Sequence, residues 1–240
     1  MRTVKFLHKW LSVIVALQLL IWLGSGLFFN LMDHSKARGT EYRISPEKTL
    51  KIDHGQLKDL SNVLKHTSKP VSSIKLIELL GKPYYLVNYQ AGLYKHFYNE
   101  HALIQAYSGE NVIIDEGMAK ELASNTYSGI GKPNEIAKLS PPIDDFPKEQ
   151  NAVWQVKFSD DINTSVYVDA SSGRLVGHSN DDKRFADFFF MLHFMDYGSV
   201  GGFNNWQIIF FAFLTLFFCF TGVIWVVELA RKGRYRFVIN

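Results

Sequence analysis

WLSVIVALQLLIWLGSGLFF, residues Trp10–Phe29, decides the fold of this chain, because none of its 20 residues is charged. A helix rises about 1.5 Å per residue, so this stretch would reach roughly 30 Å, the thickness of a bilayer core. A second uncharged stretch, Trp206–Val227, has 22 residues. The two stretches exclude a simple soluble globular protein and predict two transmembrane helices, one near each end of the 240-residue chain.

The net charge of +3 is concentrated beside these two stretches. Between residues 30 and 180, 17 basic residues stand against 18 acidic ones. The basic excess flanks the predicted helices and consists of Arg2, Lys5, Lys9, Arg231, Lys232, Arg234 and Arg236. This distribution disfavours a nucleic-acid partner, which would need a basic surface on the central region.

The same basic flanks predict the topology. Lys and Arg beside a spanning helix stay in the cytoplasm, so we expect both termini inside and the central region outside, in the periplasm of a bacterium. A cleaved signal peptide is the alternative for the first stretch, but its apolar run is longer than usual and no A-x-A-like site follows it. The single cysteine, Cys219, lies in the second stretch, so the exported region is expected to lack disulfides.

The region after the first helix predicts a connector, a short helix and a sheet. Residues 33–48 are polar and read as a connector, and apolar residues at helical spacing occur over Leu57–Leu64. Residues 72–80 and 82–90 are typical of two strands, with Gly81-Lys82-Pro83 as the turn signal. Residues 92–105 could pair with them as a third strand.

A second unit begins near Gly109. It contains a predicted helix at Glu116–Leu122, a proline-rich break at 140–147, and two strands within residues 152–158 and 164–177. In the latter, Asp169 can accept hydrogen bonds from the Ser172-Gly173 turn, and Gly173 can take a positive φ.

These two strands resemble the PepSY domain. The shared pattern is W-x-V followed by V-Y-V-D-A-x-x-G-x-L-V, and residues 70–106 resemble a weaker copy of the same unit. The matching residues are Trp154, Val156, Val166–Ala170, Gly173, Leu175 and Val176.

Motifs at the two predicted helices extend this resemblance. Leu7-His8 opens the first helix and Ser25-Gly26 lies near its end, whereas Leu192-His193 precedes the second helix and Thr221-Gly222 lies near its end. This arrangement is similar to the PepSY-associated transmembrane helix family. Larger relatives carry four or more spans and include haem-containing ferric-siderophore reductases, whereas this chain has two.

The predicted fold class is therefore a membrane protein of α+β type, with two transmembrane helices flanking an exported domain of two PepSY-like helix-plus-antiparallel-sheet units. The predicted segments are 1–32 for the tail and first helix, 33–108 and 109–180 for the two PepSY-like units, 181–203 for an interfacial helix and loop, 204–229 for the second helix, and 230–240 for the cytoplasmic tail.

Two histidines, His8 and His193, are the candidate site residues. An ionisable group at a spanning helix is a functional hypothesis by default. Imidazole is an axial ligand of haem iron, and the resemblance implies haem. Because the chain has no C-x-x-C-H motif, the haem would be non-covalent, of b type. The alternative is that both imidazoles only face lipid headgroups and water.

These two histidines cannot ligate one iron, because roughly 30 Å of hydrocarbon would separate them. His8 therefore needs a second chain, and a homodimer or a membrane partner subunit is expected. His193 could pair with its dimer mate or with His34, which follows the first helix. Two haems would then pass electrons from a quinol or a cytoplasmic donor to an outer acceptor.

The sequence thus predicts transmembrane electron transfer to a periplasmic acceptor, ferric iron or a ferric siderophore among them. No G-x-S-x-G, Walker, G-x-G-x-x-G or H-E-x-x-H motif supports another enzyme class, and whether the chain is an enzyme is left open. The alternative is a haem-free, membrane-anchored PepSY module that binds or regulates a periplasmic partner such as a peptidase.

Other polar residues have simpler interpretations. The pair His96 and His101 is not expected to bind a metal, because their odd spacing on a strand puts them on opposite faces. Residues 183–197 predict a helix, either lying in the membrane interface or also holding His193 over the helix bundle. Gln18 is interpreted as an interhelical hydrogen bonder, and Glu228 as a snorkelling side chain beside Arg231. The remaining histidines are expected at the surface, and these are His54, His66 and His178.

Overall fold

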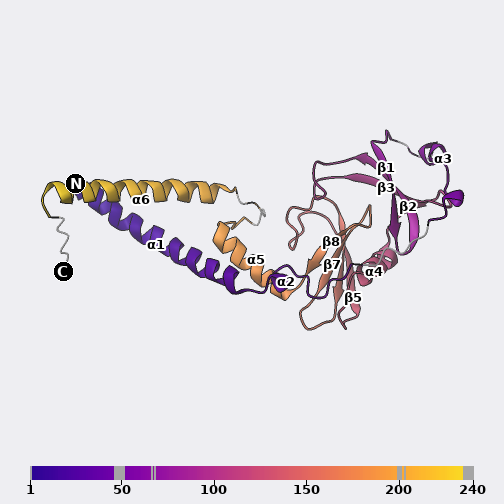
Figure 1. The fold of residues 1–240 in the computed structure, drawn as a ribbon, viewed down its shortest axis with the longest axis horizontal. Coiled ribbons are helices and arrows are strands. Elements are labelled where there is room, and N and C mark those ends of the chain that lie inside the picture. Colours follow the sequence, from indigo (N-terminus) through magenta and orange to yellow (C-terminus); the bar gives the residue numbers. More distant parts are fainter. Residues whose placement is uncertain are drawn as a thin grey trace. The chain divides into compact units, whose positions relative to one another are not determined.

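The structure, a computed structural model, describes residues 2–45, 52–65, 67, 69–198, 202 and 204–234. It is an α+β chain with two four-stranded antiparallel sheets (Figure 1). Along the sequence, one long apolar helix precedes these sheets and another follows them. The chain divides into two compact units. We call Met1–Met32 with Asp187–Asn240 the helical unit, and Asp33–Ala186 the sheet unit. The predicted surface position of His66 and part of the predicted connector lie outside the described residues.

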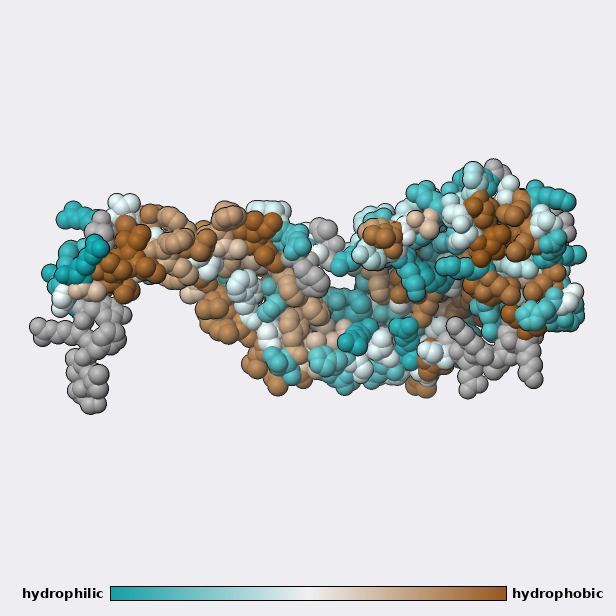
Figure 2. Space-filling model, turned by 45° about the horizontal axis from the view of Figure 1, so that its top comes forward, coloured by the Kyte–Doolittle hydropathy of each residue, from teal (hydrophilic) through white to brown (hydrophobic). Residues whose placement is uncertain are grey.

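The helical unit is built on α1 (Arg2–Leu31) and α6 (Trp206–Arg231), both long and apolar enough to cross a membrane. In a soluble helix pair the apolar side chains are buried and the polar ones exposed, whereas here most of the buried residues are polar and most of the large apolar side chains are exposed. The buried residues of α1 are Gln18 and Ser25, and those of α6 are Phe211 and Thr221. Most of the large apolar side chains of these helices point outward and colour the helical unit brown in Figure 2. Such a surface suits an apolar surrounding such as a lipid bilayer.

The helix α5 (Asp181–Phe194) confirms the helix predicted over 183–197 and begins two residues earlier. The Asn180 side chain accepts a hydrogen bond from the backbone N–H of Lys183 at 2.9 Å and so caps its N-terminus. The helix ends where Met195 takes φ +50° and the N–H of Asp196 donates to the Met191 carbonyl at 3.0 Å. Its position at a membrane interface stays a prediction.

The first sheet of the sheet unit has the order β1-β2-β3-β4. Its strands are β1 (Ser73–Leu79), β2 (Lys82–Gln90), β3 (Glu100–Gln105) and β4 (Asn111–Val112). The two predicted strands are confirmed, and Leu80 and Gly81, both at positive φ, form the tight turn between them. The predicted third strand is confirmed only over β3. Because β4 pairs with β3, the first sheet extends past the predicted boundary at residues 108 and 109.

The second sheet has the order β5-β6-β7-β8. Its strands are β5 (Pro133–Leu139), β6 (Val153–Phe158), β7 (Ser165–Asp169) and β8 (Leu175–Ser179). The strand predicted over 152–158 is confirmed as β6, whereas the stretch 164–177, predicted as one strand, holds β7 and the start of β8 with the Ser172-Gly173 turn between them. The strand β5 was not predicted. It begins at a proline, lies at the edge of the sheet and shows no clear alternation, so its sequence gives little strand signal.

One core joins the two sheets. The helix α4 (Glu116–Ser124) is capped by Asp115, whose side chain accepts from the Met118 N–H at 2.8 Å. Residues of both sheets and of α4 form a single buried cluster, which includes Tyr84, Leu103, Ala119, Leu122, Val156, Phe158, Val166 and Val168. The two predicted PepSY-like units therefore share a core and fold as one body. Three short helices complete the described chain, namely α2 (His34–Ala37), η1 (His54–Gln56) and α3 (Leu60–Lys65).

Two predictions about the second sheet meet different outcomes. Asp169 binds its turn as expected, because Oδ1 accepts from the backbone N–H groups and the hydroxyls of Ser171 and Ser172, and Gly173 takes φ +70°. The surface position of His178 is wrong, since only 2% of this residue is exposed. Strand β8 places His178 opposite Val166, on the face that turns toward the core.

Candidate cofactor site in the helical unit

His8 lies in the N-terminal part of α1 and contacts α6. Its Nδ1 lies 2.9 Å from the hydroxyl of Thr221. Its ring stacks on Phe218, with ring centroids 4.5 Å apart and planes inclined by 11°. Trp225 approaches the same imidazole edge-on, at 5.4 Å between centroids. The imidazole is thus held by one hydrogen bond and two aromatic neighbours, all from α6.

His193 lies in the last turn of α5 and contacts α1 in the same manner. Its Nδ1 lies 2.8 Å from the hydroxyl of Ser25. Its backbone carbonyl accepts a hydrogen bond of 2.7 Å from the indole N–H of Trp22, and its ring meets Phe29 edge-on at 5.3 Å. The sequence predicted that this helix could hold His193 over the helix bundle, and in the structure it packs His193 against α1.

The two hydroxyls favour one tautomer of both imidazoles. The Ser25 hydroxyl lies 2.7 Å from the Ile21 carbonyl, and the Thr221 hydroxyl lies 2.7 Å from the Phe218 carbonyl, so each can donate its proton within its own helix. In that arrangement each hydroxyl accepts from Nδ1–H of the histidine beside it. Nδ1 of His8 and of His193 then carries the proton, and Nε2 keeps its lone pair.

A glycine follows each hydroxyl, and only the one beside Thr221 is needed to make room for the histidine ring. A methyl group at Gly222 would lie 3.1 Å from Cε1 of His8, closer than nearly all real contacts of this kind. At Gly26 the same addition would lie 3.8 Å from Cε1 of His193, an ordinary contact distance. The sequence motifs thus pair crosswise, because the L-H of each half meets the S/T-G of the other.

The two imidazoles lie too far apart to bind one metal ion. Ser25, the partner of His193, is 17 residues beyond His8 on α1. At about 1.5 Å per residue this separation is roughly 25 Å. The structure therefore agrees with the expectation that His8 and His193 of one chain cannot ligate one iron.

A b-type haem fits the chemistry of these two positions. Imidazole Nε2 with its lone pair is the ligating form, and a hydrogen bond from Nδ1–H to an oxygen is the support that ligating histidines normally have. Nε2 of His8 and of His193 forms no hydrogen bond within the described part of the chain. The indole N–H of Trp225, buried and without a partner, adds a free donor beside His8.

His34 is not brought into this arrangement. It is the first residue of α2, is exposed, and belongs to the sheet unit, whereas His193 belongs to the helical unit. The pairing of His34 with His193 therefore stays a prediction.

The remaining polar predictions have clear outcomes. Of the pair His96 and His101, only His101 lies on a strand, so the predicted placement of both on opposite faces of one strand is wrong. The expectation that they bind no metal stays a prediction. Glu228 pairs with Lys232 rather than with Arg231. Gln18 does not form the predicted interhelical hydrogen bond within this chain, because its amide nitrogen is buried without a partner among the described residues.

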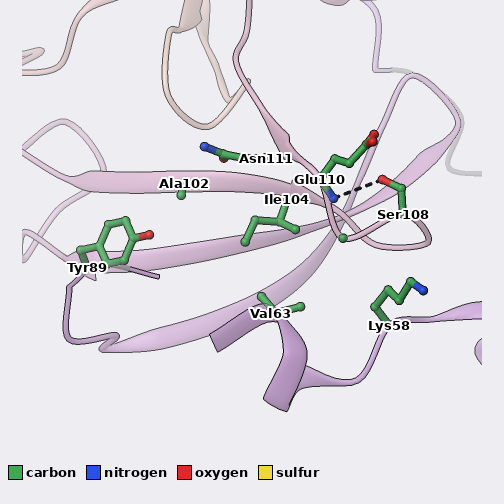
Figure 3. Close-up of a pocket in the computed structure, with 9 residues that line it drawn as sticks. Lys58, Val63, Tyr89, Ala102, Ile104, Ser108, Glu110 and Asn111 are labelled. Atoms are coloured by element: carbon green, nitrogen blue, oxygen red, sulfur yellow. Dashed lines mark hydrogen bonds between the residues drawn. The ribbon is translucent and has the colours of Figure 1, made fainter. Parts of the chain in front are cut away.

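The sheet unit contributes a pocket that the sequence did not indicate (Figure 3). Its volume is about 650 Å³, and Val63 of α3 and Ile104 of β3 form part of its apolar lining. Lys58 and Glu110 supply opposite charges, and the Ser108 hydroxyl accepts from the Glu110 N–H at 3.2 Å. The described residues of the lining combine an apolar floor with one lysine and one glutamate, a composition that suits binding of an amphipathic segment.

Comparison with known proteins adds no assignment. No family model, no curated protein and no solved structure matches this chain. The resemblance to the PepSY-associated transmembrane helix family therefore rests on the motifs alone.

Proposed function

We propose that this chain is a bacterial inner-membrane protein that carries electrons across the membrane through two non-covalent b-type haems. Both termini would lie in the cytoplasm, and the sheet unit, with its two PepSY-like halves, would lie in the periplasm. The acceptor would be periplasmic, ferric iron or a ferric siderophore among the candidates. In that case the chain is a ferric reductase or its electron-transfer subunit.

One observation carries the proposal. His8 lies near one end of α1, and His193 of α5 contacts α1 near its other end. Both imidazoles are held in the same tautomer by the same kind of partner, a helix hydroxyl whose proton is donated to its own backbone. Imidazoles that only faced headgroups would need no fixed tautomer, and they would have no reason to share one arrangement. The repeated geometry is what two equivalent ligand positions require.

A second copy of the chain would complete each site. One chain offers a single imidazole at each position, and two haem ligands therefore call for a dimer or a partner subunit. Two copies of α1 and α6 would form a four-helix arrangement, a common setting for cofactors bound within a helix bundle. The large apolar side chains exposed on both helices supply surface for such an association.

When bound, haem would supply an iron that accepts and passes on one electron. The residues of this chain would prepare its surroundings. The hydroxyls of Ser25 and Thr221 orient the imidazoles and raise the basicity of Nε2 by accepting the proton of Nδ1. Phe218 and Trp225 exclude water from one face of His8, and Phe29 does so at one edge of His193.

The test is the absorption spectrum of protein purified from cells supplied with haem. We expect a Soret band that sharpens on reduction with dithionite, low-spin features typical of two imidazole ligands, and a dimer in mild detergent. Protein without Soret absorbance would overturn the proposal.

The alternative is a haem-free anchored module that binds a periplasmic partner. The pocket of the sheet unit favours it, because an apolar floor with one lysine and one glutamate suits a peptide segment. If protein without haem binds a periplasmic partner with undiminished affinity, that result would support this alternative function.

A further inference from the structure

A second feature of the helical unit lies between its helices. The side chains of α1 and α6 and the residues just after α5 line an open pocket of about 330 Å³. Its lining is almost wholly apolar and includes Ile21, Met195, Trp206 and Phe210. Among the described residues none of those that line it is charged, which disfavours an ionic ligand.

Two glutamines interrupt this apolar lining. Gln18 of α1 is only 7% exposed, and its Nε2 is buried without a hydrogen-bond partner among the described residues. Gln207, in the first turn of α6, lines the same pocket, and its Oε1 is likewise buried and unpartnered. An unsatisfied polar group in an apolar setting costs about 1–3 kcal/mol. Two amides therefore line the pocket, and each has one unpaired atom that neighbouring side chains cover.

The apolar lining and the two unpaired amides together limit which molecule can bind in the pocket. A lipid acyl chain would fill the volume but leave both amides unpaired. A second copy of the chain would have to reach Gln18 from outside, yet Gln18 is turned inward. A flat apolar ring with oxygens at opposite ends would fill the pocket and pair with both amides once their side chains turn toward it. Because every amide carries both a donor and an acceptor, rotation of its last bond serves a carbonyl or a hydroxyl equally well.

We propose that this pocket binds the ring of a para-quinone and of the corresponding quinol, with Gln18 and Gln207 as the hydrogen-bonding residues. Pockets for such ligands are apolar, partly aromatic and carry few polar groups. The outward apolar surface of α1 and α6 offers a path for an apolar tail. The ligand would be drawn from the membrane itself.

The position of the pocket links it to His193. Met195, in its lining, is two residues beyond His193. Phe211, also in the lining, meets the ring of Trp22 at 5.5 Å, and the Trp22 indole donates to the His193 carbonyl. That a quinol bound here donates electrons to the haem at His193 rests on the proposed function. That the pocket binds the quinone ring does not.

The test uses the full chain in lipid nanodiscs and a decyl-substituted para-benzoquinone. Binding is followed by quenching of tryptophan fluorescence, because Trp206 lines the pocket. We expect saturable quenching, and roughly tenfold weaker binding for Gln18→Leu and for Gln207→Leu, since each loses one buried hydrogen bond. The matched control is Thr215→Val, which removes another buried and unpartnered oxygen of α6 that lies outside the pocket. This control should bind like the unaltered chain.

Three results would overturn the proposal. The first is quenching that does not saturate, which means partition of the quinone into lipid. The second is equal binding by all four proteins. The third is a dimer that dissociates on Gln18→Leu without any change in quinone binding, which would assign the amide to a second copy. Saturable binding by protein without a Soret band would refute the electron-transfer function and leave this site standing.

Discussion

His8 and His193 of the helical unit and His178 of the sheet unit each bond to a serine or threonine hydroxyl, but through different ring nitrogens. His178 Nε2 lies 3.0 Å from the Thr126 hydroxyl, which donates its own proton to the Ala123 carbonyl at 2.9 Å. The hydroxyl therefore accepts from Nε2, and Nδ1 of His178 is left buried and unpartnered. In His8 and His193 the hydroxyl accepts from Nδ1 instead.

This difference separates two roles for one residue type. An imidazole anchored through Nδ1 presents the Nε2 lone pair at the far end of the ring, where a metal ion can approach. An imidazole anchored through Nε2 inside a core has its remaining nitrogen against the protein and stays neutral. Burial accordingly lowers the pKa of His178 to about 4. The comparison shows that the bonded nitrogen distinguishes a candidate ligand from a core residue.

The largest expected effect is on the spectrum. If each histidine of the helical unit ligates its own haem, His8→Ala should remove one spectral component and leave the other, and His193→Ala should do the converse. Loss of one of two imidazoles converts low-spin iron to high-spin or releases the haem. The absorption spectra of reduced protein measure this effect.

His96→Ala and His178→Gln serve as controls and should leave the spectrum unchanged. A spectrum that survives both His8→Ala and His193→Ala would break the comparison, because the two classes of histidine would then be equivalent.

The next effect is a pH dependence confined to the sheet unit. His178 has a folded pKa of about 4, below its ordinary value of 6.5, so the unfolded chain binds the additional proton. The contribution of neutral His178 to the free energy of unfolding is fully present above pH 6.5. It is lost as the pH falls toward 4, by about 3 kcal/mol in total. Hydrogen exchange of the amides of β7 and β8 measures the loss.

His178→Gln should remove most of this dependence, because its amide N–H can donate to Thr126 but does not titrate. Burial also lowers the pKa of His101, which accounts for the remainder. Equal pH dependence in the variant and in the unaltered chain would refute the assignment to His178.

A third prediction concerns the hydroxyls. Thr221→Val and Ser25→Ala should each weaken haem binding about 10- to 100-fold, because the supporting hydrogen bond to the imidazole is lost. Thr126→Val should leave haem binding unchanged and destabilise the sheet unit by about 1–3 kcal/mol. Haem titration and denaturant unfolding measure the two quantities. Haem loss with Thr126→Val would contradict the separation of roles.

The smallest effect distinguishes the two sites of the helical unit from each other. Gly222→Ala would press a methyl group against His8 at 3.1 Å, and about 1 kcal/mol of haem affinity should be lost. Gly26→Ala leaves an ordinary 3.8 Å contact and should cost less than about 0.5 kcal/mol. Haem titration of both variants decides the order, and an equal loss in both would show that the close approach at Gly222 has no effect.

Much of the fold was predictable because its signals are local. The uncharged stretches, the strand pair joined at Gly81 and the Asp169 turn depend on neighbours in the chain, and the structure has a long helix, a hairpin and a turn at these places. The missed elements lack such signals. β4 has two residues, and β5 is an edge strand whose pairing with β6 alone defines it. His178 was misplaced because its burial depends on the register of β8 with β7.

The candidate site was predictable only in its parts. The sequence determined that His8 opens the first long apolar helix, that His193 precedes the second, and that an S/T-G pair occurs in each half, because these are facts of spacing. It could not determine that His8 meets Thr221 or that His193 meets Ser25, since 213 and 168 residues separate them. The tertiary structure alone decided the tautomers and the inward position of Gln18. The physical reason is that hydrogen bonds between helices depend on how the helices pack, and no pattern along one helix specifies its partner.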